Sequence, residues 1–147
     1  MIEVRTLKPE DREDWEPLWD GYNRFYERAV PAQVTERTWA LLMDGSKEPH
    51  GLAAVRDGRV IGFAHYWYQG TTAALLPKCY LQDLFVLPEA RGLRIGEKLI
   101  EAVYDAADAH GASEVYWLTQ HFNGPGRALY DRVGELTPFI KYRRPGE

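Results

Sequence analysis

The residues of this sequence that could do chemistry gather in one turn, which reads Arg-Gly-Leu-Arg-Ile-Gly from Arg91 to Gly96. A short apolar run, 84–87, precedes the turn and an amphipathic segment follows it. A strand that leads through such a turn into a helix presents unpaired backbone N–H groups at the positive end of the helix dipole, where phosphate or pyrophosphate binds. Arg91 and Arg94 add positive charge, and Gly92 and Gly96 let the backbone approach an anion closely. An ordinary strand–turn–helix with two surface arginines fits the same residues, and both interpretations stay open at this point.

Two elements must position this turn, a strand before it and a helix after it. The run 84–87 is typical of a strand covered on both faces, and Pro88 ends it because proline has no amide for a ladder. From Arg94 to Asp108, apolar residues recur at intervals of three, four and seven, which predicts one buried helix face made of Ile95, Leu99, Ala102, Val103, Ala106 and Ala107. Gly111 stands where a C-terminal cap is expected.

The rest of the chain predicts a mixed α/β fold in a single domain spanning 1–147. The Asp57-Gly58 pair between two apolar runs predicts a hairpin. Strands are expected over 2–7, 51–55, 60–68, 80–87, 114–119 and 139–143, and helices over 9–26, 35–43, 94–108 and 125–133. The resulting order, β-α-α-β-β-β-α-β-α-β, does not alternate strictly, so the sheet should be partly antiparallel. Most aromatic residues of the first two helices should lie in the core, while a minority could wall a pocket, since aromatic faces attract cations.

Composition excludes several classes of protein. The formal net charge of −4 argues against a nucleic-acid binder, which normally has a basic face, and is compatible with a cationic substrate. Cys79 is the single cysteine, so no internal disulfide can form and a reducing compartment is expected. No apolar run approaches the roughly 20 residues that span a bilayer, and the first residues lack a secretion signal. We therefore expect a cytoplasmic protein with no membrane or nucleic-acid partner.

Two motifs resemble those of a known family. The segment Asp83-Leu-Phe-Val-x-Pro-x-x-Arg91-Gly-x-x-Ile-Gly96-x-x-Leu99-Ile resembles the acyl-CoA-binding motif of the GNAT superfamily of N-acetyltransferases. Downstream, Asn123-x-x-Gly126-x-x-x-Tyr130-Asp-Arg-Val-Gly134 resembles the second signature of that family. The predicted element order agrees with the GNAT fold, so the resemblance covers nearly the whole chain. Within the superfamily, 80–86 and 115–118 look most similar to the polyamine, histone and diamine acetyltransferases.

The resemblance implies a set of site residues for acetyl-CoA. Backbone amides of the turn, from Arg91, Gly92, Leu93, Arg94, Ile95 and Gly96, would hold the pyrophosphate of coenzyme A. Leu84, Phe85 and Val86 would pair with the pantetheine arm as an added strand would, and the strands 80–87 and 114–119 would splay apart to admit it. Asn123 would contact that arm, with Gly126 beside it in the motif, and Tyr130 would lie beside the thioester sulfur.

The chemistry of a phenol suits that role for Tyr130. Attack of an amine on a thioester expels a thiolate whose conjugate acid has a pKa of roughly 8.5, and a phenol of pKa about 10 still holds its proton at neutral pH. Tyr130 could therefore protonate the thiolate. A core tyrosine at a helix end is the alternative, and Asn123, seven residues earlier in the same motif, favours the catalytic interpretation.

The sequence departs from the family pattern at Arg94, where a glycine is usual. A side chain there must point away from the pyrophosphate or bind it, and a guanidinium can bind an anion bidentately.

The second departure concerns the base. An alkylammonium of pKa ~10.4 must lose a proton before it attacks, which costs about 4–5 kcal/mol at pH 7. The polyamine-type enzymes commonly have glutamate where this chain has Gln82, whose amide can orient a water but cannot accept the proton. Asp83 should point to the opposite face, since strand residues alternate, and should be a partly buried carboxylate bonded to backbone or to an arginine. His121 is either a relay of near-neutral pKa or a surface histidine.

The sequence therefore predicts an N-acetyltransferase that moves an acetyl group from acetyl-CoA to a primary amine by direct attack. Tyr130 is the predicted acid, with Gln82 or His121 organising a water relay. The acceptor is either a small, polyamine-like amine or a lysine or N-terminus of a peptide. No metal is implied, because no histidine–carboxylate cluster has ligand spacing. A non-catalytic acyl-CoA-binding module is the alternative, motivated by Gln82 and Arg94, and we expect a homodimer that pairs through the last strand.

Overall fold

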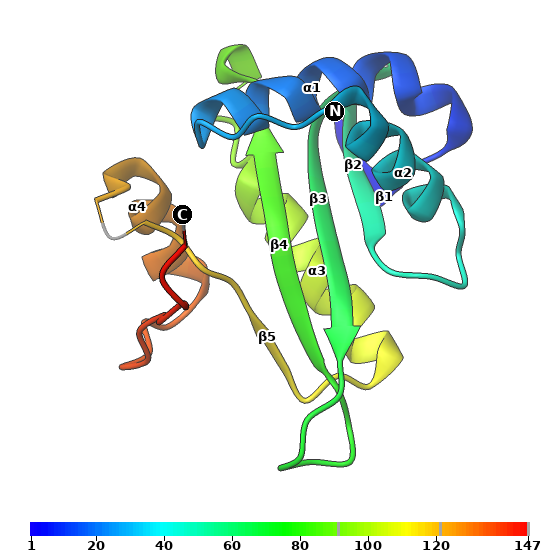
Figure 1. Ribbon diagram of the computed structural model, residues 1–147. Coiled ribbons are helices and arrows are strands. Elements are labelled where there is room, and N and C mark those ends of the chain that lie inside the picture. The colour runs from blue at the N-terminus through cyan, green and yellow to red at the C-terminus, as the bar shows by residue number, and fades with distance from the viewer. Residues whose placement is uncertain (91, 121, 147) are drawn as a thin grey trace.

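A five-stranded sheet forms the centre of the computed structural model, which describes residues 1–90, 92–120 and 122–146 (Figure 1). The strands lie in chain order, as β1 (Ile2–Thr6), β2 (His50–Arg56), β3 (Arg59–Gln69), β4 (Lys78–Val86) and β5 (Glu114–Tyr116). The first four are antiparallel to their neighbours, and β5 is parallel to β4. The helices are α1 (Arg12–Phe25), α2 (Ala32–Met43), α3 (Ile95–His110) and α4 (Gly124–Val133), with short 3-10 turns at Pro9–Asp11 and Pro88–Ala90.

Helices cover both faces of this sheet, and the central strands β2 and β3 are therefore buried on both sides. α1 and α2 lie on one face and α3 on the other (Figure 1). On the α1 side, Trp15, Trp19 and Trp39 pack around the buried ring of Phe63. On the α3 side, Leu99, Ile100 and Val103 are fully buried against the sheet. The predicted mixed α/β class is confirmed.

α3 shows why the periodicity of its sequence was informative. It runs from Ile95 to His110, and its buried residues include four of the six predicted for the inner face, Ile95, Leu99, Val103 and Ala107. Gly111 ends the helix with a left-handed φ of 89°, as expected for a glycine cap. Ile100 is also fully buried, although it was not among the residues predicted for the inner face.

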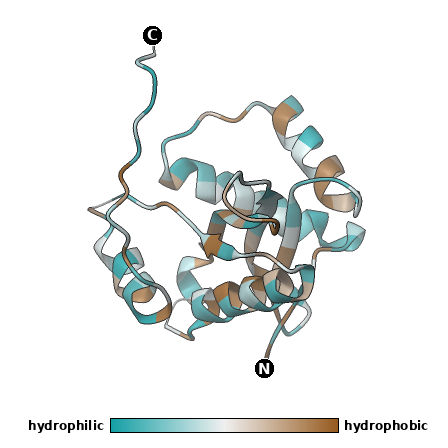
Figure 2. Cartoon of the chain, turned by 90° about the horizontal axis from the view of Figure 1, so that it is seen from below, coloured by the Kyte–Doolittle hydropathy of each residue, from teal (hydrophilic) through white to brown (hydrophobic). Residues whose placement is uncertain are grey.

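The predicted strand over 139–143 is wrong. No secondary structure is assigned after α4 in the described part of the chain, and Phe139, Ile140 and Tyr142 are 86%, 76% and 88% exposed. Figure 2 shows this last segment extending away from the body of the chain. A strand needs a ladder partner, and β5, the nearest sheet edge, covers only Glu114–Tyr116 instead of the predicted 114–119. Within residues 1–90, 92–120 and 122–146, the apolar residues of the tail join no strand of the sheet.

Replacing Leu99 by alanine should lower the free energy of unfolding by about 3–4 kcal/mol, because it would leave a cavity between α3 and the sheet. Urea denaturation followed by circular dichroism measures the loss. Leu75→Ala is the matched control, since Leu75 is fully exposed, and its effect should stay within about 0.5 kcal/mol. Equal losses in the two variants would contradict the core position of Leu99.

Candidate functional site

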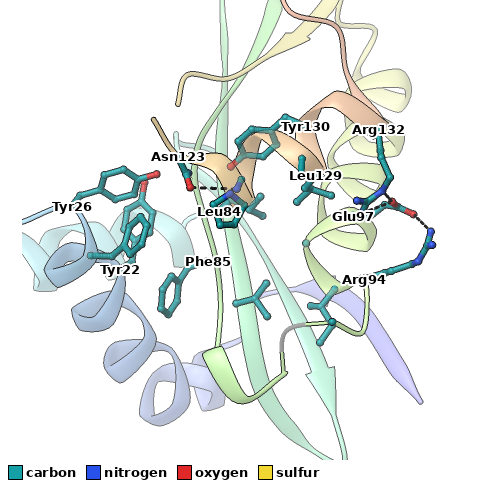
Figure 3. A pocket seen from close by; sticks show the side chains of 18 residues that line it. Tyr22, Tyr26, Leu84, Phe85, Arg94, Glu97, Asn123, Leu129, Tyr130 and Arg132 are labelled. Atoms are coloured by element: carbon teal, nitrogen blue, oxygen red, sulfur yellow. Dashed lines mark hydrogen bonds and ion pairs between the residues drawn. The ribbon is translucent and has the colours of Figure 1, made fainter. Parts of the chain in front are cut away.

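A cavity of about 550 Å³ opens where β4, the start of α3, the end of α1 and α4 meet. Figure 3 shows its walls, with Tyr22 and Tyr26 on one side, Arg94 and Glu97 on the other, and Tyr130 between them. The cavity brings together most of the predicted site residues, namely Leu84, Phe85, Val86, Gly92, Arg94, Ile95, Gly96, Asn123, Gly126 and Tyr130. Leu93 and Gln82 are not among the lining residues. Arg91 and His121 lie outside the described residues, so their predicted roles stay predictions.

The cavity is open because β4 and β5 separate. Their ladder joins only 78–80 of β4 to 114–116 of β5, whereas β4 stays paired with β3 up to Val86. Beyond Tyr80, the edge of β4 is left without β5, and at Leu84–Val86 it borders the cavity. An extended chain can add to such an edge through main-chain hydrogen bonds.

The turn before α3 has the backbone shape that a glycine-rich motif provides. Gly92 and Arg94 both have left-handed φ angles, of 90° and 58°. A residue other than glycine pays roughly 1–2 kcal/mol for this conformation, which explains why the family pattern has glycine where this chain has Arg94. The turn lines the cavity and leads into the N-terminus of α3, where the helix dipole favours an anion.

The Arg94 side chain points along α3. Its Nη1 atom lies 3.6 Å from Oε2 of Glu97, and the side chain is 70% exposed. Glu97 also accepts hydrogen bonds of 3.3 Å from Arg132 of α4. The guanidinium of Arg94 is therefore tied to the rim of the cavity, and Figure 3 shows this cluster on the side away from Tyr22.

Asn123 and Gly126 act together at the start of α4. The side-chain oxygen of Asn123 accepts a hydrogen bond of 3.3 Å from the backbone N–H of Gly126 and so caps the helix. A Cβ on residue 126 would lie 2.4 Å from the side-chain nitrogen of Asn123, so only glycine leaves room for this cap. The spacing of the second motif thus has a structural cause, besides the cofactor contact that the resemblance implies.

Tyr130 projects from α4 into the cavity. Its ring packs edge-on against Trp117, with 5.5 Å between ring centroids, and its hydroxyl points toward Asn123 in Figure 3. Burial, with a smaller contribution from nearby Tyr26, raises the pKa of Tyr130 to about 12. The phenol therefore holds its proton throughout the neutral range.

Two tyrosines at the end of α1 form the opposite wall, and the sequence did not single them out. Tyr22 and Tyr26 meet edge-on, 5.1 Å between centroids, and both line the cavity. The Tyr22 hydroxyl donates a hydrogen bond of 3.3 Å to the carbonyl of Gln82. Burial and then the negative charge of Asp83 raise the pKa of each tyrosine. The expectation that some N-terminal aromatic residues wall a pocket was the only signal for them.

A β-bulge in β4 changes which side chains face α1. His65 pairs with Asp83 and Tyr66 with Leu81, so Gln82 has no partner in β3. Leu81 and Leu84, three residues apart, consequently both pack on the α3 side, and Asp83 turns toward α1. The expectation that Asp83 faces away from Gln82 rests on strict alternation of side chains, and the bulge interrupts that alternation at Gln82.

Asp83 is buried more deeply than predicted, with 4% of its surface exposed. Its Oδ2 atom lies 2.9 Å from Nδ1 of His65, and Arg28 is 4.0 Å from Oδ1. The predicted partner was backbone or an arginine, so the main partner differs. The described residues contain no group of three or more histidine, cysteine or acidic side chains that could hold a metal ion. None of the helices in that part of the chain combines the length and apolar character that crossing a membrane requires.

Comparison with known proteins identifies the family. The model of the acetyltransferase (GNAT) family matches residues 10–134. The D-amino-acid N-acetyltransferase HPA3 of Saccharomyces cerevisiae is 37% identical over 147 residues, covering 99% of this chain and 91% of that protein.

Two solved structures share the fold. The ribosomal-protein-alanine N-acetyltransferase of Brucella melitensis biovar Abortus superposes with a TM-score of 0.84, 20% identity, and coverage of 99% of this chain and 100% of that chain. A complex of the aminoglycoside N-acetyltransferase AAC(6')-Iy with CoA gives a TM-score of 0.78 and 22% identity, covering 98% and 95% of the two chains. With a family match that runs from the start of α1 through α4 and the same fold in solved structures, the chain belongs to the GNAT family of acetyltransferases.

Proposed function

We propose that this chain transfers an acetyl group from acetyl-CoA to the primary amine of a small molecule or a peptide. The observation that carries the proposal is that one cavity joins an open strand edge, the N-terminus of a helix and a protonated phenol. An open edge suits the amide-containing pantetheine arm, and the turn from Gly92 to Gly96 suits its pyrophosphate. The fold neighbour that was solved with CoA supports acetyl-CoA as the cosubstrate.

The residues of the cavity divide the reaction between them. Leu84–Val86 orient the bound thioester so that a neutral amine can attack its carbonyl carbon; the C–N bond forms and the C–S bond breaks. Tyr130 donates a hydrogen bond to the sulfur as negative charge develops there and protonates the thiolate. The proton that the new amide nitrogen loses restores the phenol, so the protons balance.

The character of the α1 wall supports an amine as the acceptor. Tyr22, Phe25 and Tyr26 present aromatic surface to the cavity, and Arg28, which lies over the ring of Tyr22, is 4.0 Å from the Asp83 carboxylate. Aromatic faces and a carboxylate attract an ammonium group. Because HPA3 is by name an enzyme of D-amino acids, amino acids join polyamines and peptide amines among the acceptors to be tested.

Tyr130→Phe should keep the binding of acetyl-CoA and slow turnover by ~10²–10⁴-fold, because it removes only the acidic hydroxyl. Thiol release with acetyl-CoA and a panel of spermidine, D- and L-amino acids and a basic peptide measures turnover, and calorimetry measures binding. Tyr142→Phe is the control, since Tyr142 is exposed on the tail.

Equal turnover in Tyr130→Phe and the unaltered chain would remove Tyr130 from the mechanism. No thiol release with any amine, while acetyl-CoA still binds, would favour the non-catalytic binding module.

We also propose that the chain works as a homodimer. The exposed side chains of Phe139, Ile140 and Tyr142 support this, because adjacent exposed apolar residues are typical of interaction surfaces. Light scattering should give twice the chain mass for the unaltered protein and the single chain mass for the double variant Phe139→Lys, Ile140→Lys. A monomer in both cases would contradict the proposal.

A further inference from the structure

The buried carboxylate of Asp83 lies on the α1 side of β4, and only one of its two oxygens is hydrogen-bonded within the described residues. Oδ2 of Asp83 is bonded to His65, whereas Oδ1 has no hydrogen-bond partner within the described part of the chain. A buried, unpartnered oxygen on a charged group is costly, so natural proteins rarely keep one without a use. The pairing of Asp83 therefore calls for an explanation from function.

A tryptophan determines which ring nitrogen of His65, the partner of Asp83, accepts a hydrogen bond. Nε1 of Trp15 lies 3.0 Å from Nε2 of His65, and an indole N–H can only donate. Nε2 must therefore be the acceptor, so Nδ1 carries the hydrogen and donates it to Asp83. His65 is 1% exposed, and both of its ring nitrogens are engaged, one by Trp15 and the other by Asp83. The histidine thus orients Asp83 as a hydrogen-bond acceptor and does not compete for its protons.

Tyr22 stands between this carboxylate and the cavity. It lines the cavity, and its hydroxyl donates only a long hydrogen bond, 3.3 Å, to the carbonyl of Gln82. Gln82 is the residue before Asp83, and Arg28, which lies over the ring of Tyr22, is also 4.0 Å from Oδ1 of Asp83, so the hydroxyl and the carboxylate lie in the same small region. The bulge at Gln82 is what brings Asp83 to this side of β4.

We propose that Asp83 accepts, through the hydroxyl of Tyr22, the proton that the acceptor ammonium must lose before its nitrogen can attack. An N–H bond of the ammonium breaks and its proton passes to the oxygen of Tyr22, while the O–H of Tyr22 turns from the carbonyl of Gln82 and gives its proton to Oδ1 of Asp83. The electron pair left on nitrogen then forms the C–N bond. The inference rests on the proposed acetyl transfer and supplies the proton acceptor that Gln82, an amide, cannot be.

The other groups around Asp83 are compatible with this role. The titratable or charged side chains that face it are His65 of β3, Tyr22 and Tyr26 at the end of α1, Arg28 of the following loop and Tyr80 of β4. Arg28 is the cation of this set. Its guanidinium bonds to Asn23 at 2.6 Å and lies over the rings of Trp19 and Tyr22. It therefore stands 4.0 Å from Oδ1 without a direct hydrogen bond to it.

The test is the pH dependence of kcat/KM for the best amine of the panel, from about pH 6.5 to 9.5, in the unaltered protein and in Asp83→Asn. Loss of a proton acceptor should lower kcat/KM by ~10²-fold near neutral pH, and the difference should shrink as the pH approaches the amine pKa of about 10. A purely structural defect would lower the rate by the same factor at every pH. Tyr22→Phe keeps Asp83 in place, and its kcat/KM should also approach that of the unaltered protein as the pH rises. The test therefore does not depend on how well Asp83→Asn folds.

Asp11→Asn is the matched control. Asp11 is as buried as Asp83, at 5% exposed, but it is paired with Arg5 at 2.8 Å and lies away from the cavity. The ratio of its kcat/KM to that of the unaltered protein should not change with pH. If this ratio of kcat/KM is independent of pH in both Asp83→Asn and Tyr22→Phe, the inference is wrong and the proposed acetyl transfer still stands. An unaltered protein that acetylates no amine would instead contradict the proposed function, and the inference would fall with it.

Discussion

β4 is paired along one edge and largely unpaired along the other, and the cavity exists because of this difference. The edge toward β3 is paired from Lys78 to Val86, whereas the edge toward β5 is paired only from Lys78 to Tyr80. Unpaired backbone groups cost free energy wherever water cannot reach them, so an open edge needs a rigid support. α3 and α1 supply it by packing on the two faces of the same strand. The sheet can therefore keep a row of backbone donors and acceptors in place for a ligand that completes the ladder.

The bulge at Gln82 adds the second constraint on β4. Without it, the alternation of side chains would turn residue 82 toward α1 and Asp83 toward α3, where Leu81 and Leu84 now pack. A carboxylate in that apolar layer would have no partner. With the bulge, Asp83 meets His65, and Trp15 of α1 fixes the histidine from the other side. One extra residue in β4 thus lets Leu81 and Leu84 pack against α3 while Asp83 enters the hydrogen-bonded series with His65 and Trp15 on the α1 side.

The sequence predicted those parts of the molecule whose determinants are local. The Asp57-Gly58 hairpin, α3 and its glycine cap each follow from residues close together in the chain, and the turn that contains Gly92 and Arg94 leads into α3, as expected. The bulge could not be predicted, because it depends on how β4 is registered against β3, which is a long-range property. Tyr22 and Tyr26 were hidden for a related reason: their spacing is the same as that of core aromatics, and only the separation of β4 from β5 leaves them beside a cavity. The prediction of a strand at 139–143 was wrong because the sequence pattern of a strand contains no information on whether a neighbouring strand is available for pairing.

The arrangement of charge along the cavity gives the site a direction. At the α3 end, the helix N-terminus and Arg94 are positive, and at the α1 end, aromatic rings stand in front of the Asp83 carboxylate. A site that joins an anionic cosubstrate to a cationic acceptor must keep these two potentials apart, since otherwise each ligand would compete for the other's place. Glu97 contributes to this separation because it holds both Arg94 and Arg132 at the α3 rim. Arg28 at the opposite end bonds to Asn23, lies over aromatic rings and is 4.0 Å from the Asp83 carboxylate, so it contacts the carboxylate without a direct hydrogen bond. Tyr130, neutral and protonated, lies between the two ends, where the bonds of the proposed reaction would form and break.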